Sequence, residues 1–291
     1  MWTRLRLRAS ERVLLTFFIY VALLSAWVRP LSGLLWLPVS VLLTAAAIIV
    51  ILAAGEVRGP KWFFSYVRDW APLALTLTAY REMDWFTPKQ RDFHLENTWV
   101  VWDRLILNDW GLRRVIESAG ALLPAYFELC YLLVYAVAPF TIAMVYACNK
   151  REVVDRVLVL YLAGTLTAYA LFPYFPSAPP RTVFPGVDLP CVVTPFRELN
   201  LWLLRGYGIH SSVFPSAHVS SAFAAAWALM LFLPERRWIG WGMLFYAVSV
   251  AIATVYGRYH YAVDAVAGFG VSLGAVLLAG RQATRSPAPR S

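Results

Sequence analysis

The chain has few of the residues from which metal sites and disulfide frameworks are built. Its 291 residues include three cysteines and four histidines. Two of the cysteines, Cys130 and Cys148, lie inside apolar stretches, and the spacing of the three matches no metal motif. The cysteines therefore indicate neither a disulfide framework nor a zinc site, and we expect no metal and no other cofactor.

Charged residues are also scarce. Asp, Glu, Lys and Arg make up 15% of the chain, whereas hydrophobic residues make up 60% and the mean hydropathy is +0.59. An average soluble domain has about 25% charged residues, so this composition excludes an ordinary soluble domain. Thirteen tryptophans and fifteen tyrosines suit the two interfaces of a membrane, where aromatic side chains gather.

Several apolar stretches approach or exceed the roughly 20 residues that a helix needs to cross a bilayer. They are residues 13–28, 31–54, 119–148, 153–175, 213–233, 238–256 and 261–280. The sequence therefore predicts an all-α integral membrane protein, a polytopic bundle of about six to eight transmembrane helices.

The net charge of +9 is spread over several short clusters, so it does not favour a nucleic-acid partner. The clusters stand at helix ends, as the positive-inside rule distributes basic residues over cytoplasmic loops. They are Arg4, Arg6, Arg8 and Arg12; Lys150, Arg151 and Arg156; Arg236 and Arg237; and Arg281, Arg285 and Arg290. If all are cytoplasmic, an even number of spans must separate the first cluster from the second.

Only three of the apolar stretches lie between these two clusters, so an even number requires one more span between residues 56 and 118. Residues 70–80 are the best candidate, although Arg68 and Asp69 stand at their start, and a re-entrant or interfacial segment is the alternative. With this span, both termini are cytoplasmic. Three loops then share the outer face: residues 81–118, residues 176–212 and the turn at residues 257–260. We expect interfacial helices in residues 81–118.

Two of the four histidines stand beside polar residues at the ends of apolar stretches. Residues 214–218 read FPSAH, and residues 256–264 read YGRYHYAVD. On a helix, His260 and Asp264 share a face, so the carboxylate can accept a hydrogen bond from one ring nitrogen while the other stays nucleophilic. The alternative for this pair is a solvated helical turn at the membrane interface.

The earlier segment is typical of a helix start that binds an anion. Pro215 suits a first turn, Ser216 adds a hydroxyl to the free backbone N–H groups, and His218 can give a proton to a leaving oxygen. Helix capping alone explains Ser216, but it leaves His218 unexplained.

Two arginines are candidate phosphate ligands. Paired prolines stiffen the backbone before Arg181, whose planar guanidinium can hold two phosphate oxygens. Arg258, two residues before His260, is the second candidate. For both, an arginine among lipid headgroups is the simpler explanation.

Together these segments resemble the three signature motifs of the type-2 phosphatidic acid phosphatase superfamily. Residues 215–218 (PSAH) and 260–268 (HYAVDAVAG) resemble its second and third motifs. Residues 178–181 (APPR) are similar to the first motif in the branch that contains inositol phosphorylceramide synthase.

The resemblance implies a role for each candidate residue. His260 would be the nucleophile that forms a phosphohistidine, with Asp264 as its orienting partner, and His218 would protonate the leaving group. Arg181 and Ser216 would hold the phosphate.

Two positions depart from the superfamily's usual pattern. Tyr174 stands where a lysine is usual, seven residues before the arginine of the first motif, and Thr254 stands where an arginine is usual, six residues before the histidine of the third. Arg258 is the candidate substitute for the second of these. The departures favour the synthase-like branch over ordinary lipid phosphatases.

The resemblance therefore implies a multi-pass enzyme of the cell membrane, with its active site on the non-cytoplasmic face. It would cleave a lipid phosphoester or phosphodiester and transfer the phosphorylated headgroup to a lipid alcohol. Hydrolysis of a polyprenyl or diacylglycerol phosphate by water is one alternative, and a non-catalytic lipid-binding or transport protein is another.

We expect the chain to consist of three parts. They are residues 1–118 (first spans and outer helices), 119–280 (catalytic core) and 281–291 (a disordered cytoplasmic tail).

Overall fold

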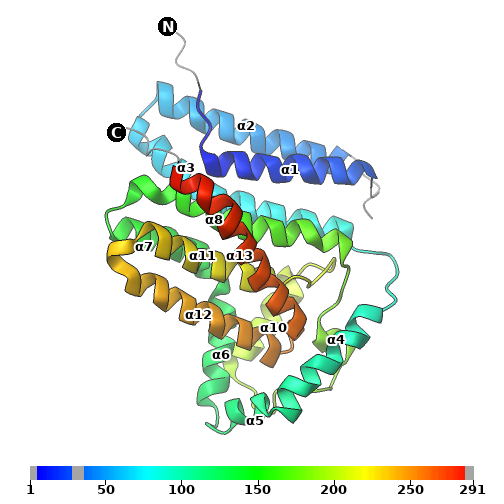
Figure 1. Ribbon diagram of the computed structural model, residues 1–291. Helices are drawn as coiled ribbons and strands as arrows, with labels where there is room; N and C mark the ends of the chain where they lie inside the picture. The colour runs from blue at the N-terminus through cyan, green and yellow to red at the C-terminus, as the bar shows by residue number, and fades with distance from the viewer. Residues whose placement is uncertain (1–4, 28–35, 286–291) are drawn as a thin grey trace.

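The computed structural model describes residues 5–27 and 36–285, and every regular element in them is helical (Figure 1). The long helices are α1 (Ala9–Trp27), α2 (Trp36–Arg58), α3 (Lys61–Glu82), α8 (Val154–Leu171), α11 (Ala217–Phe232), α12 (Arg237–Tyr256) and α13 (Ala262–Arg285). The shorter ones are α4 (His94–Arg104), α5 (Leu112–Glu117), α6 (Leu122–Leu132), α7 (Val137–Ala147), α9 (Pro180–Val183) and α10 (Pro195–Tyr207).

Six helices in these described ranges are long and apolar enough to cross a membrane. They are Ala9–Trp27, Trp36–Arg58, Leu122–Ala147, Arg151–Tyr174, Pro234–Tyr256 and Ala262–Ala279. The apolar helix α11 is shorter, at 16 residues. The prediction of an all-α, polytopic membrane bundle is confirmed.

The predicted spans and the observed helices differ mainly at their ends. Residue 28 and residues 31–35, which were included in the first two predicted spans, lie outside the described residues, as do residues 286–291 of the predicted tail. Helix α13 continues to Arg285 and so enters that tail.

The short candidate span around residues 70–80 belongs to α3, a helix of 22 residues that runs alongside α8. Asp69 meets Arg151, just before α8, and Tyr80 meets Tyr169 near the end of α8, where the ring centroids are 5.7 Å apart. Because α3 follows α8 along its length, it is a member of the bundle. Helix α3 is not among the six helices that are long and apolar enough to cross a membrane, so the span at residues 70–80 stays a prediction.

Small residues allow the central helices to approach closely. Helix α11 packs against α8, α12 and α13 (Figure 1). A Cβ on Gly164 of α8 would lie only 2.7 Å from the Cβ of Ala224 in α11, and Ser220 of α11 donates to the Gly164 carbonyl at 2.9 Å. This contact fixes α11, and therefore the residues at its start, against α8.

The first half of α3 and the ends of α1, α2 and α8 share a charged cluster. Arg68 donates to Glu11 and also to Glu56, and Asp69 pairs with Arg8 and Arg151. The Asp155 carboxylate of α8 accepts the backbone N–H groups of Ala9 and Ser10, which are the first two of α1. These contacts hold the charges that lower the hydropathy of α3. Chain direction places the cluster at the opposite end of the bundle from the two histidines.

The segment between α3 and α6 lies apart from α1 and α2, at the lower end of the bundle in Figure 1. Its helices α4 and α5 are joined by a π-turn, Leu105–Asp109. Trp102 and Trp110 are exposed there. Short helices with exposed tryptophans agree with the expectation of interfacial helices in residues 81–118.

Candidate active site

Three of the predicted catalytic residues converge where α11 and α13 begin. Nδ1 of His218 lies 3.3 Å from Nε2 of His260, and Nδ1 of His260 lies 3.3 Å from a carboxylate oxygen of Asp264. Two histidines that are 42 positions apart in the chain are therefore within hydrogen-bonding distance. His260 and Asp264 are both buried.

The turn after α12 determines where His260 stands. The N–H groups of Tyr259 and His260 both donate to the Thr254 carbonyl, at 2.9 and 3.0 Å, and Arg258 N–H donates to Val255. This is a Schellman-type helix end, in which the residue after the cap is left-handed and is usually glycine. Here that residue is Arg258, with a φ of 61°. The turn then delivers His260 to the start of α13.

The start of α11 holds the second motif against the third. Ser216 is the N-cap of α11, and its hydroxyl accepts from the N–H of Val219 at 3.4 Å. Its own N–H donates to the Asp264 carbonyl at 2.9 Å. Helix capping therefore accounts for the buried Ser216 hydroxyl in this structure. Its contact with a phosphate stays a prediction.

Arg181 reaches the site from α9, the single turn of helix that begins at the second of the paired prolines. Its N–H donates to the carbonyl of Arg258 at 3.3 Å, and Nη1 donates to that of Tyr259 at 3.4 Å. Its guanidinium lies 5.6 Å from the centre of the Tyr259 ring. These contacts place a cation beside the turn that carries His260.

The hydrogen bonds assign the proton of the His260 ring. Nδ1 lies 2.9 Å from the carbonyl oxygen of Val213, which can only accept, so Nδ1 carries the hydrogen of the neutral ring and Nε2 keeps its lone pair. Burial lowers the pKa of His260 to about 3, and the charge of Arg181 acts in the same direction. The ring is therefore neutral at pH 7, and its free nitrogen faces His218.

Arg258 contacts α4 through Nη1, while its Nε and Nη2 have no hydrogen-bond partner among the described residues, and its contact with a phosphate stays a prediction. Its side chain is fully buried, and Nη1 pairs with the Asp103 carboxylate of α4. The other oxygen of Asp103 accepts the N–H of Ala262, at the start of α13, at 2.8 Å. Asp103 therefore fixes both sides of His260. Nothing in the sequence indicated this role, because Asp103 lies 155 residues before Arg258.

Glu128, a buried carboxylate in α6, supports the same turn from another direction. It accepts hydrogen bonds from Arg197 and Asn200 of α10, both at 2.8 Å, and from the Tyr259 hydroxyl at 2.5 Å. The Tyr259 ring stacks on Tyr131, with centroids 3.9 Å apart. Tyr131 lies in turn 5.3 Å from the His218 ring.

The two positions that depart from the superfamily's pattern have other functions here. The Thr254 carbonyl accepts the two N–H groups of the Schellman turn, and its side chain is buried. Tyr174 is exposed, with its hydroxyl 3.3 Å from that of Tyr20. Throughout the described parts of the chain, no group of three or more His, Cys, Asp or Glu side chains is placed to hold a metal ion.

A family comparison agrees with this geometry. The model of the PAP2 superfamily matches residues 99–278, which include every residue of the site described above. Neither the curated proteins nor the solved structures contain a match to the chain.

Proposed function

The chain belongs to the PAP2 superfamily, and we propose that it is a phosphotransferase that moves the phosphorylated headgroup of one lipid to the alcohol of another. Membership of the superfamily supports a lipid phosphatase or phosphotransferase. The observation that carries the proposal further is the 3.3 Å approach of the His218 and His260 rings, with Arg181 beside them.

In the first step, the Nε2 lone pair of His260 attacks phosphorus, and the bond from phosphorus to the leaving oxygen breaks. The leaving oxygen keeps the bonding electron pair and takes a proton from His218, which enters this step as the imidazolium and leaves it as the neutral ring. The product is a phosphohistidine on His260. The Val213 carbonyl, which accepts from Nδ1 at 2.9 Å, supports this role because it keeps Nε2 unprotonated.

In the second step, an alcohol enters the place that the leaving group vacated. His218 takes the alcohol proton, the oxygen bonds to phosphorus, and the bond from phosphorus to Nε2 breaks. Both histidines then return to their starting states. Arg181 would hold the charged phosphoryl oxygens in both steps, which is the main demand of phosphoryl transfer.

Synthase-like motifs favour a lipid alcohol as acceptor, since APPR is similar to the first motif of that branch. Water in the second step would make the same site a phosphatase for polyprenyl or diacylglycerol phosphate. We further propose that residues 119–280 carry catalysis, that the enzyme acts in the cell membrane, and that its site faces away from the cytoplasm. The separation of the site from the basic helix ends supports this orientation.

The test uses purified protein, phosphorus-labelled lipid phosphates and phosphodiesters, and EDTA, with and without a lipid alcohol. A new phospholipid with release of diacylglycerol is expected from a transferase. Free phosphate from the lipid phosphates, with a free phosphorylated headgroup from the phosphodiesters, would replace the proposal with hydrolysis. Acid-labile label on the protein should appear in the wild type and be absent from His260→Ala.

His210→Ala is the matched control for that variant, because the His210 ring is 76% exposed and lies beside Asp84. We expect it to retain the wild-type rate. Turnover by His260→Ala would exclude His260 as the nucleophile, and the absence of any product from wild-type protein would overturn the enzymatic proposal itself.

A further inference from the structure

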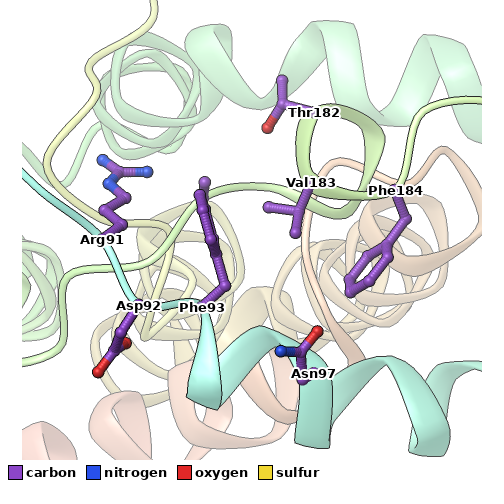
Figure 2. Close-up of a pocket in the computed structure, with 8 residues that line it drawn as sticks. Arg91, Asp92, Phe93, Asn97, Thr182, Val183 and Phe184 are labelled. Atoms are coloured by element: carbon purple, nitrogen blue, oxygen red, sulfur yellow. The ribbon is translucent and has the colours of Figure 1, made fainter.

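A cavity of about 550 Å³ lies next to α9, the helix that carries Arg181 (Figure 2). Its walls come from residues 91–93 and Asn97, at the start of α4, and from Ala178 and residues 182–184. Arg181 contacts the turn before His260, whereas the next two residues line the cavity. One turn of helix therefore separates the cavity from the catalytic histidines.

Arg91 is the cation of this cavity. Its side chain is partly buried, and it has no ion pair with any residue in the described ranges. Burial lowers the pKa of Arg91, while the charge of the Glu96 carboxylate acts in the opposite direction. A guanidinium in such a place is stabilised by an anion with two acceptor oxygens.

The neighbouring carboxylate does not neutralise Arg91. Asp92 accepts the N–H of His94 at 3.3 Å and contacts Nδ1 of the same residue at 2.6 Å. In Figure 2 its carboxylate points away from the Arg91 guanidinium, while the Asn97 amide lies below Phe93 and Phe184. The cavity thus offers the Arg91 guanidinium and the Asn97 amide, with the Asp92 carboxylate pointing away. The buried Glu96 carboxylate lies near Arg91 but accepts the N–H of Ala178 at 2.8 Å.

Phe93 adds a second, independent observation. Its φ is 56°, in the left-handed region, where a bulky aromatic residue is an outlier. Backbone strain of this kind gathers at ligand-binding positions. In Figure 2 the ring stands between Arg91 and Phe184 as one wall of the cavity. Aromatic walls displace water and so strengthen a charge contact beside them.

We propose that this cavity binds a second anionic group of the lipid substrate, a phosphate or a carboxylate outside the reacting phosphoryl group, with Arg91 as its counterion. The inference rests on the proposed function, because Arg181 is taken to hold the reacting group. Arg91, from the segment before α4, and Arg181, from α9, then bind two anions of one substrate. A substrate with a single anion leaves Arg91 without its partner.

Binding is measured with His260→Ala protein, which cannot turn over substrate, in vesicles of neutral phosphatidylcholine. The probes are short-chain phosphatidylinositol 4-phosphate and phosphatidylinositol with the same acyl chains, which differ by one anionic group. We expect the first to bind at least about tenfold more tightly, the effect of a charge-assisted contact. Arg91→Gln should abolish the difference, and Arg91→Lys should restore part of it.

Lys89→Gln is the matched control, because Lys89 is an exposed cation two residues earlier that does not line the cavity. It should leave the difference intact. Equal losses for both probes in Arg91→Gln, or no preference in the parent protein, would overturn the proposal. Because binding is read without turnover, failure of the transfer assay would leave this result standing.

Two further arms identify the source of the anion. If the second anion belongs to the substrate, inorganic phosphate weakens the binding of phosphatidylinositol 4-phosphate more than that of phosphatidylinositol, because it competes at Arg91 as well as at Arg181. Anionic phosphatidylserine in the vesicles then has little effect. Competition by phosphatidylserine that disappears in Arg91→Gln would overturn the assignment to the substrate, because a neighbouring lipid would then occupy the cavity.

Discussion

The carbonyl oxygen of Val213 lies 2.9 Å from Nδ1 of His260, closer than the nearest carboxylate oxygen of Asp264, at 3.3 Å. That carboxylate oxygen also accepts the N–H of Tyr261 at 2.9 Å. The backbone just before the second motif thus fixes the tautomer of the nucleophile, and Asp264 divides its hydrogen-bonding capacity between the ring and the start of α13.

This division makes Asp264→Asn less damaging than loss of the nucleophile. A carboxylate that alone holds a catalytic histidine is worth about 10⁴-fold in kcat. Because Val213 still accepts from Nδ1, we expect kcat to fall by about 10- to 100-fold in Asp264→Asn, with phosphoenzyme still detectable. A loss as large as that of His260→Ala, measured side by side, would mean that the Val213 contact does not hold the ring.

The approach of α13 to α11 leads to a second prediction. A Cβ on Gly268 would lie 2.4 Å from the carbonyl oxygen of Ser216, whereas one on Gly270 would meet nothing within 4 Å. Gly268→Ala must therefore move the start of α11, and with it His218, away from His260. We expect at least about a tenfold loss of kcat, since small displacements of reacting groups are costly.

Gly270→Ala is the control for that variant, because it makes the same chemical change in the same helix. It should keep its rate and raise the melting temperature slightly, as alanine favours helix. Equal activities of the two variants would contradict the account of the contact between α11 and α13.

The buried pair of Glu128 and Arg197 allows a double-mutant test of stability. Removing one member leaves a buried charge without a partner, which typically costs about 3–5 kcal/mol. We therefore expect Glu128→Ala to lower the melting temperature in detergent more than Glu128→Ala/Arg197→Ala does. Glu235→Ala, which breaks an exposed pair with Lys150, should change it little. Additive losses in the double variant would show that the two side chains are not coupled.

The environment of His260 leads to a pH prediction. Burial and Arg181 lower its pKa to about 3, so the folded protein leaves it neutral where an unfolded chain would begin to protonate it near pH 6.5. The unfolded state therefore binds more protons between these values, and stability falls as the pH drops through that window. Nε2 itself stays available.

Histidine-selective nitrogen NMR of the purified protein checks this directly. The His260 signals, assigned by comparison with His260→Ala, should stay at neutral-ring positions from pH 7.5 to 4.5. A His260 midpoint near 6.5 would contradict the buried, Arg181-facing environment.

The sequence was a good guide to the helices and to the motif residues, because both depend on local patterns. Apolar runs identify spans, and the i, i+4 spacing brings His260 and Asp264 to one side of the turn. Helix α3 was harder, since Arg68 and Asp69 lower its hydropathy. Their partners, Glu11 and Arg151, are distant in the chain, so no local window could show that these charges are neutralised within the bundle.

The contacts that hold the site residues in place could not be predicted from the sequence in the same way. Arg258 was predicted as a phosphate ligand from its position beside His260. Its partner Asp103 lies 155 residues earlier, and nothing in either segment connects them. The Arg91 cavity likewise joins the start of α4 to α9 across a long stretch of chain. Contacts of this kind depend on tertiary packing, which single-sequence patterns do not contain.

The charged cluster at the end of the bundle opposite the two histidines limits how far the chain can be shortened from its N-terminal side. Residues 99–278 match the family model, yet within that stretch Asp155 accepts from the N–H groups of Ala9 and Ser10, and Arg151 pairs with Asp69. A fragment trimmed to the family match would present these charges to lipid or to one another. We therefore expect that a chain able to assemble in a membrane must begin near Arg8, well before the first residue of the family match.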